Sequence, residues 1–325
     1  MTATYRIAEE LISLSAPEQW LMLMANMAPF RVMTDDTCVP AFALEVKEQP
    51  GLDEPSAFNH FFTDNSEADM PRLEVYQSDT QWLIRIAQTA QAPVCCRLVA
   101  DKDFRHARLA VLSGQSATAV RFAIDNAVML LFAFATAHRH TLEMHASVVV
   151  HERKAYLFLG HSGTGKSTHA RQWLALYHWA YLLNDDNPVL RIDDDGQLWV
   201  YGTPWSGKTP CYRNERVRVA ALVQLEQAPH NEVLPLAPSQ CYAYMLSSCS
   251  GLKIVHEAMD GIHDTISRIV LHTPMAKLRC LPDKPSAQCC YDYFNSPANH
   301  YPTNPHHQPS MADITNDKSQ MTNHK

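Results

Sequence analysis

The chain lacks both a block of lysine and arginine and a framework of cysteines. Its formal net charge is −7 and its pI is near 6.2, so neither nucleic acid nor an anionic membrane surface is an expected partner. The nine cysteines include no C-x-x-C pair, and Cys95-Cys96 and Cys289-Cys290 are adjacent, an arrangement that seldom bridges within itself. An odd number without regular spacing predicts reduced thiols and a cytoplasmic location.

Long apolar runs are also scarce. The longest, residues 127–137, is much shorter than the ~20 residues that cross a bilayer. Arg121 and Asp125 precede this run at helical spacing, so we expect a buried helix over roughly 119–138. The first residues carry Glu9 and Glu10 where a leader would be basic, so no export signal is expected.

Glycine is rare, and its few copies are unevenly placed. Only 10 residues are glycine, against a usual share of roughly 7%, yet three of them lie between positions 160 and 165. Residues 160–168 read G-H-S-G-T-G-K-S-T and fit the phosphate-binding loop pattern G-x-x-x-x-G-K-[ST]. An apolar stretch at 156–159 precedes the motif and apolar residues at helical spacing follow it, which predicts strand, turn and helix.

This motif predicts a nucleotide site at the start of a helix. Successive backbone N–H groups surround a phosphate there, and the helix dipole favours its negative charge. Lys166 is expected to reach the β- and γ-phosphates, and Ser167 to hold Mg²⁺. The predicted nucleotide-binding residues are Gly160, His161, Ser162, Gly163, Thr164, Gly165, Lys166, Ser167 and Thr168.

Changes in composition along the chain predict two domains and a tail. Residues 1–115 contain short strands with a hairpin at 73–86 and a polar stretch, 53–70, that reads as loop; we expect a strand-rich accessory domain. Residues 116–293 contain the phosphate-binding loop and predict an α/β catalytic domain. Residues 294–325 are rich in Asn, Pro and His without an apolar period, which predicts a disordered tail.

The strand before the loop strand constrains the fold. Residues 144–150 read as a strand, joined to the next one by the polar tetrapeptide 151–154. So short a connection makes the two strands antiparallel, because a parallel crossover needs a dozen or more residues. We therefore expect a mixed sheet. Further expected elements are an Asp-Gly hairpin over 188–201, strands at 217–225 and 276–280, and helices at 239–250 and 264–272.

Two adjacent acids follow the loop helix. Asp185 and Asp186 end an apolar strand, where one acid can hold Mg²⁺ beside Ser167 and the other can face a substrate hydroxyl; the alternative is a pair of turn residues. His145 opens the strand antiparallel to the loop strand. It either supports phosphate or aspartate charge or is a strand-end histidine with no role in catalysis.

A second glycine-punctuated loop, 202–209, precedes Arg213. Lys208 and Arg213 are candidate phosphate or substrate contacts that would complete a positive clamp, and solvated charges on an exposed turn are the alternative. Trp205 either stacks on a base or fills the core.

His145, the loop and the acid pair together resemble the catalytic domain of bacterial HPr kinase/phosphorylase. The resemblance covers roughly residues 140–210. The chain more closely resembles the HPr-kinase-like proteins encoded with peptide-modification systems, some of which phosphorylate serine on a peptide. It implies a phosphoenolpyruvate carboxykinase-like P-loop fold. It also implies that Asp186 is the base toward a serine hydroxyl, that Lys166 and Ser167 handle phosphates and metal, and that His145 supports the acid.

The sequence thus predicts an α/β, cytoplasmic kinase that uses ATP and Mg²⁺ and acts on an alcohol. The expected acceptor is the serine hydroxyl of a peptide, a protein or the free amino acid. A nucleotide-binding module without phosphotransfer and a P-loop ATPase are the alternatives. No membrane or nucleic-acid partner is expected, and the sequence is compatible with a homo-oligomer.

Overall fold

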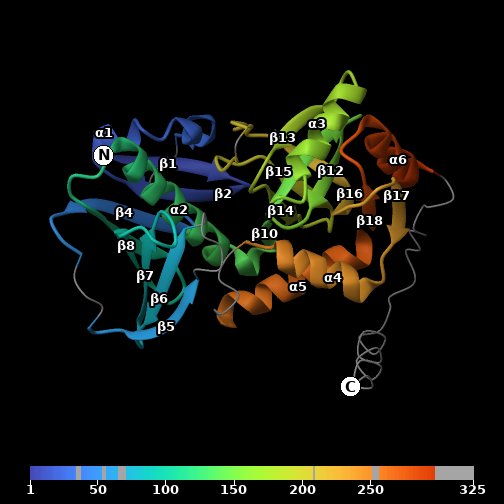
Figure 1. Cartoon of the computed structure of the whole chain (residues 1–325). Coiled ribbons are helices and arrows are strands. Elements are labelled where there is room, and N and C mark those ends of the chain that lie inside the picture. The colour runs from blue at the N-terminus through green and yellow to red at the C-terminus, as the bar shows by residue number, and fades with distance from the viewer. Residues whose placement is uncertain (34–37, 53–55, 65–70, 208, 251–255, 297–325) are drawn as a thin grey trace.

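The computed structural model describes residues 1–33, 38–52, 56–64, 71–207, 209–250 and 256–296. In these residues the chain forms two mixed sheets of nine strands each, with helix α2 (Ala117–Ala135) between them (Figure 1). One hydrophobic core runs from the N-terminal sheet through α2 into the second sheet. The protein is therefore a mixed α/β protein, as expected.

The N-terminal sheet has the strand order β3-β1-β2-β4-β9-β8-β7-β6-β5. Its strands are β1 (Thr2–Ile7), β2 (Glu10–Ser15), β3 (Arg31–Val32), β4 (Phe42–Gln49), β5 (Asn59–Asp64), β6 (Arg72–Gln77), β7 (Gln81–Ala87), β8 (Val94–Asp101) and β9 (His106–Leu112). Helix α1 (Glu18–Leu21) and the 3-10 helix η1 (Ala25–Phe30) join β2 to β3. The predicted strand-rich character and the β6–β7 hairpin are confirmed.

Strand β5 corrects the expectation that 53–70 is loop. It pairs with β6 at the edge of the sheet, and its residues are exposed or half-buried. A strand at a sheet edge can be polar because little of it has to be buried. Its sequence therefore lacks the apolar alternation that marks an inner strand. The remaining parts of that stretch, 53–55 and 65–70, lie outside the described residues.

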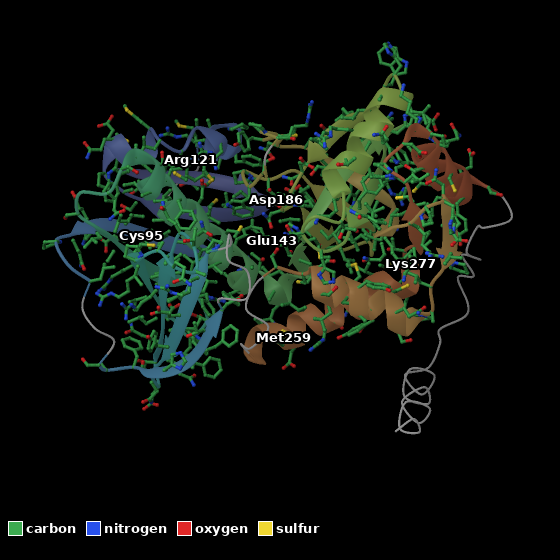
Figure 2. All side chains as sticks on the ribbon, viewed as in Figure 1. Cys95, Arg121, Glu143, Asp186, Met259 and Lys277 are labelled. Atoms are coloured by element: carbon green, nitrogen blue, oxygen red, sulfur yellow. The ribbon has the colours of Figure 1, made fainter. Side chains whose placement is uncertain are left out.

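Helix α2 matches the expected helix over most of its length. Ser116 caps it by accepting a hydrogen bond from the Ala119 N–H, and Arg121, labelled in Figure 2, pairs with Asp125 one turn later at 3.3 Å. The helix ends at Ala135, and η2 (Ala137–Arg139) follows. By length and composition α2 could cross a membrane, but 56% of its most apolar 18-residue stretch is buried inside the protein. It is the central core helix.

The second sheet contains the phosphate-binding loop. Its strands are β10 (Thr141–Glu143), β11 (Ala146–His151), β12 (Lys154–Leu159), β13 (Tyr181–Asn184), β14 (Val189–Ile192), β15 (Leu198–Tyr201), β16 (Arg216–Gln227), β17 (Glu232–Pro235) and β18 (Met275–Cys280). The order is β10-β14-β15-β16-β12-β11-β13, and β18 pairs with β16 and β17. The predicted antiparallel β11–β12 pair and the β14–β15 hairpin are both present. Strand β12 runs parallel to β16.

Four helices cover this sheet (Figure 1). They are α3 (Lys166–Leu176), α4 (Pro238–Ser248), α5 (His256–His272) and α6 (Lys284–Asn295). Helix α6 was not predicted, and its last two residues fall in the stretch expected to be a disordered tail. Asp283 caps α6 by accepting from the Ser286 N–H, and the helix packs against α3, so tertiary contact extends order to Asn295. Residues 297–325 lie outside the described residues.

A buried histidine joins α3 to α6. His169 is 3% exposed; its Nε2 accepts from the Trp173 Nε1–H at 3.0 Å, and its Nδ1 lies 3.2 Å from the Ser286 hydroxyl. This arrangement assigns the ring proton to Nδ1, because Nε2 is an acceptor. Burial lowers the pKa of His169 to about 4. The neutral ring thus anchors the helix whose first turn follows the phosphate-binding loop.

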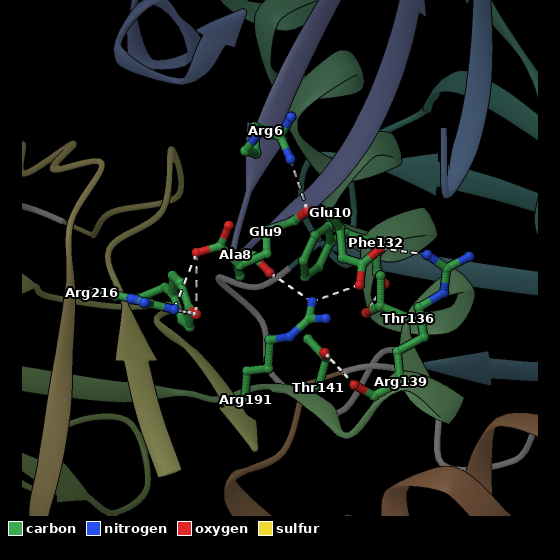
Figure 3. Close-up of polar contacts among 11 residues, drawn as sticks. Arg6, Ala8, Glu9, Glu10, Phe132, Thr136, Arg139, Thr141, Arg191 and Arg216 are labelled. Atoms are coloured by element: carbon green, nitrogen blue, oxygen red, sulfur yellow. Dashed lines mark hydrogen bonds and ion pairs between the residues drawn. The ribbon is translucent and has the colours of Figure 1, made fainter. Parts of the chain in front are cut away.

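A second buried polar group ties the two sheets together (Figure 3). Glu10, at the start of β2, is 5% exposed. Its Oε1 lies 2.6 Å from Arg191 Nη1 and its Oε2 lies 2.5 Å from Arg139 Nη1. Arg191 also donates to the Ala8 carbonyl at 2.9 Å. The β1–β2 turn is therefore fixed to β14 and to η2, the short helix that follows α2.

Candidate active site

The phosphate-binding motif forms the expected turn between β12 and α3. Its three glycines all have positive φ: 150° at Gly160, 79° at Gly163 and 107° at Gly165. A Cβ on Gly160 would lie 3.1 Å from Thr164 Cγ2, closer than the turn can accept without moving. The motif therefore forms a tight, curled loop that leads into the N-terminus of helix α3.

Two side chains hold the shape of this loop. Lys166 is buried, and its Nζ donates to the Gly160 carbonyl at 2.8 Å and to the His161 carbonyl at 3.3 Å. Gln227, the last residue of β16, donates through Nε2 to the carbonyls of Gly163 and Thr164 at 3.2 and 3.3 Å. The lysine ammonium thus lies against the loop backbone, where it can exchange carbonyl oxygens for phosphate oxygens.

The strand order brings the acid pair close to the loop. In β11, Ala146 is the register partner of Leu159, the residue before the loop. The Ala146 N–H donates to the Asp186 carbonyl at 2.9 Å on the other side. Since neighbouring strands are ~4.8 Å apart, the backbones of Asp186 and Gly160 are separated laterally by about 10 Å. Asp186 and the loop therefore lie at the same edge of the sheet, on either side of the start of β11.

His145 and the two acids are paired as follows. His145 Nδ1 lies 3.2 Å from Asp186 Oδ1, and the two side chains are 37% and 31% exposed. Asp185 is largely buried, and its Oδ1 accepts from the Ser147 hydroxyl at 2.6 Å. Asp186 is therefore the more accessible acid, while Asp185 is held by the strand beside the loop.

The second glycine-punctuated loop packs against these acids. Asn184 donates through Nδ2 to the Thr203 hydroxyl and to the Trp205 carbonyl, both at 3.0 Å. A Cβ on Gly207 would lie 3.2 Å from the Asp185 carbonyl oxygen, so glycine permits this close approach. Trp205 is buried with its ring 5.4 Å from that of Phe132, which supports the core-filling alternative for this tryptophan.

Two cationic side chains, Arg213 and Lys208, are predicted near this loop. Arg213 Nε donates to the Leu182 carbonyl at 2.9 Å, and the guanidinium lies 5.0 Å from the centroid of the Tyr181 ring. These contacts hold Arg213 against β13. Lys208 lies outside the described residues.

The donors available for a metal ion are oxygens. A hydroxyl at Ser167 and a carboxylate at Asp185 are the kind of ligand that Mg²⁺ prefers. In the part of the chain that the structure describes, no group of three His, Cys, Asp or Glu side chains is arranged to hold a metal. A magnesium ion here would therefore share its coordination with phosphate oxygens and water, as is usual for this ion.

The region that contains the loop is similar to a known protein family. Residues 110–271 match the family described as SynChlorMet cassette protein ScmC. The match covers just under half of the chain and includes His145, the phosphate-binding loop and the acid pair. The search of curated proteins finds no match.

Within the ScmC-matched segment, Glu143 is a site residue that the sequence analysis missed. It is 2% exposed on β10, and Figure 2 shows it next to Asp186. Burial raises the pKa of Glu143 well above its usual range; the Ser250 hydroxyl opposes this and the negative charge of Asp186 adds to it. The fold therefore favours the protonated form of Glu143. The sequence signal for this buried acid is an acidic residue between two apolar ones, Leu142 and Met144.

A cavity of about 460 Å³ also adjoins the loop. Loop residues 161–164, the last four residues of β16, Tyr244 of α4 and Lys277 of β18 line it. Lys277 lies beyond the end of the ScmC match. Because these residues come from elements far apart in the sequence, no local motif could have predicted their association.

Proposed function

We propose that this protein is an ATP-dependent kinase that transfers the γ-phosphate to an alcohol, with a serine hydroxyl as the acceptor. The observation that carries the proposal is the His145–Asp186 pair, 3.2 Å apart, one strand away from a phosphate-binding loop. We also infer the phosphoenolpyruvate carboxykinase-like P-loop fold. The antiparallel strand β11 before the loop strand supports that fold over an ordinary βαβ arrangement.

The reaction uses Asp186 as general base. The acceptor hydroxyl donates its proton to the Asp186 carboxylate while its oxygen forms a bond to the γ-phosphorus. The bond from that phosphorus to the oxygen that bridges the β- and γ-phosphates breaks, and ADP leaves with the electron pair. A positioned base of this kind contributes ~10²–10⁴-fold to the rate, and His145 orients its carboxylate.

The remaining groups hold the phosphates in line. Loop N–H groups and the Lys166 ammonium bind the β- and γ-phosphate oxygens. Mg²⁺, held by Ser167 and Asp185, would neutralise charge on those oxygens. The hydrogen bond from Ser147 fixes the orientation of Asp185.

Label transfer from γ-labelled ATP, with Mg²⁺ and serine-containing acceptors, tests this proposal. We expect Lys166→Ala to lose both nucleotide binding and transfer. Asp186→Asn is expected to keep binding and to lose transfer by ~10²-fold or more, because the base is gone while the loop is intact. Asp194→Asn, at an exposed acid in the β14–β15 turn, is the matched control and should behave as wild type.

Three outcomes would contradict the proposal. Equal transfer by Asp186→Asn and wild type would remove the base. Nucleotide binding with no transfer to any acceptor would favour the binding module. Phosphate release that does not depend on an acceptor would favour the P-loop ATPase.

A further inference from the structure

The cavity beside the loop lies on the side opposite to the acid pair. Strand β12 is flanked by β11 on one side and by β16 on the other. The acid pair follows β13 and lies beyond β11, whereas the cavity is formed at the ends of β16 and β18. Figure 2 shows Lys277 near α4 and well separated from Asp186.

This arrangement sets which end of a bound triphosphate faces the acid pair and which end faces the cavity. If the γ-phosphate faces Asp186, the chain of phosphates follows the loop toward β16. The α-phosphate, and whatever it carries, then arrives at the cavity. Gln227 supports this path, because it ties the carbonyls of Gly163 and Thr164 to the end of β16 and so fixes the loop at the cavity's edge.

The cavity offers groups that an inorganic phosphate chain does not need. Tyr244 presents a half-buried aromatic ring. The Lys277 Nζ lies 5.5 Å from the centroid of that ring and 2.9 Å from Glu226 Oε2, and Arg279 Nε pairs with the other oxygen of Glu226 at 3.0 Å. A flat ring beside a fixed carboxylate suits a base and a ribose hydroxyl.

A buried acceptor in the cavity wall lacks a partner. Gln224, the register partner of Lys277, is 8% exposed and lines the cavity. Its Oε1 has no hydrogen-bond partner among the residues that the structure describes, and a buried polar atom in this state is uncommon in folded proteins. An N–H donor from a ligand would satisfy it.

We infer that this cavity receives the nucleoside of the phosphoryl donor, so that the donor is a nucleoside triphosphate and not pyrophosphate or another inorganic polyphosphate. The base stacks on Tyr244 and donates an N–H to Gln224, and a ribose hydroxyl donates to Glu226. The inference rests on the proposed function, which sets the direction of the triphosphate.

Calorimetric titration of the full chain with ATP and with tripolyphosphate, each with Mg²⁺, tests the inference. Wild type is expected to bind ATP at least tenfold more tightly. Tyr244→Leu should weaken ATP binding about tenfold, since stacking of one base on an aromatic ring is worth roughly five- to a hundredfold in affinity, and should leave tripolyphosphate binding unchanged. Tyr244→Phe keeps the ring and should bind both as wild type does. Thermal unfolding verifies that each variant is folded.

The inference is overturned if wild type binds both compounds equally, or if Tyr244→Leu weakens both by the same factor. Lys166→Ala separates this failure from that of the proposed function. Loss of tripolyphosphate binding in Lys166→Ala shows that the loop holds phosphate, so that only the nucleoside assignment falls. Unchanged binding of both compounds by Lys166→Ala overturns the kinase proposal and the nucleoside assignment together.

Discussion

Lowering the pH should destabilise the protein through His169. In the folded state its Nε2 accepts from Trp173 and its ring is buried, so a second proton would lose this hydrogen bond and place a charge in the core. The pKa of His169 is about 4 when folded, against 6.5 for a free histidine. The unfolded chain therefore binds this proton more readily. The stabilising contribution is complete above pH ~6.5 and is lost as the pH falls toward ~4.

The size of the effect follows from the two pKa values. A tenfold difference in proton affinity is worth about 1.4 kcal/mol, so the interval between 6.5 and about 4 amounts to ~3 kcal/mol at full protonation. About 2 kcal/mol of this is lost between pH ~7.5 and pH ~5. That is a large share of the 5–15 kcal/mol that is typical for a folded domain.

Urea unfolding, followed by tryptophan fluorescence at both pH values, measures this loss. His169→Gln is the comparison, because its side chain can form hydrogen bonds but does not titrate. It should be less stable than wild type at pH ~7.5, and should lose ~2 kcal/mol less than wild type on going to pH ~5. Other titrating groups contribute equally to both proteins and cancel. Parallel losses in the two proteins would refute this account of His169.

Two further predictions concern buried acids. Glu10→Gln should lower the free energy of unfolding by roughly 2–4 kcal/mol, because Arg139 and Arg191 lose a charged partner that is itself buried; urea titration measures this. Glu143 has a raised pKa in the folded protein, so wild type should lose stability relative to Glu143→Gln as the pH rises from ~4.5 to ~7.5. Unfolding of both proteins across that range provides the measurement.

Each of these predictions has a control and an opposing outcome. Glu18→Gln, at an exposed acid on α1, should change the free energy of unfolding by less than ~0.5 kcal/mol. If Glu10→Gln has an effect as small as that of Glu18→Gln, the ion pairs of Glu10 do not hold the sheets together. For Glu143, a stability difference from Glu143→Gln that does not depend on pH would show that this acid is not held neutral.

Local pattern alone determined the phosphate-binding turn, the helix that follows it and the hairpins at β6–β7, β11–β12 and β14–β15. These elements depend on contacts between residues near one another in the chain, and their glycine, turn and apolar signals are local. Such signals also predicted that His145 would come near the loop, because one short turn aligns β11 with β12. They did not predict the individual strands β1 to β5, strands β10 and β17, or helix α6. Of these, β3, β5, β10 and β17 lie at sheet edges, where less apolar surface has to be buried.

Only the tertiary structure decided which distant residues share the site. The order β13-β11-β12-β16, with β18 beside β16, places Asp186 on one side of the loop and Gln224, Tyr244 and Lys277 on the other. No local signal encodes that order, because it results from packing of the whole sheet against α2 and its neighbours. Burial likewise decided the pKa shifts: it lowers the pKa of His169 and raises the pKa of Glu143, since the pKa of a side chain responds to the low-polarity surroundings that folding creates.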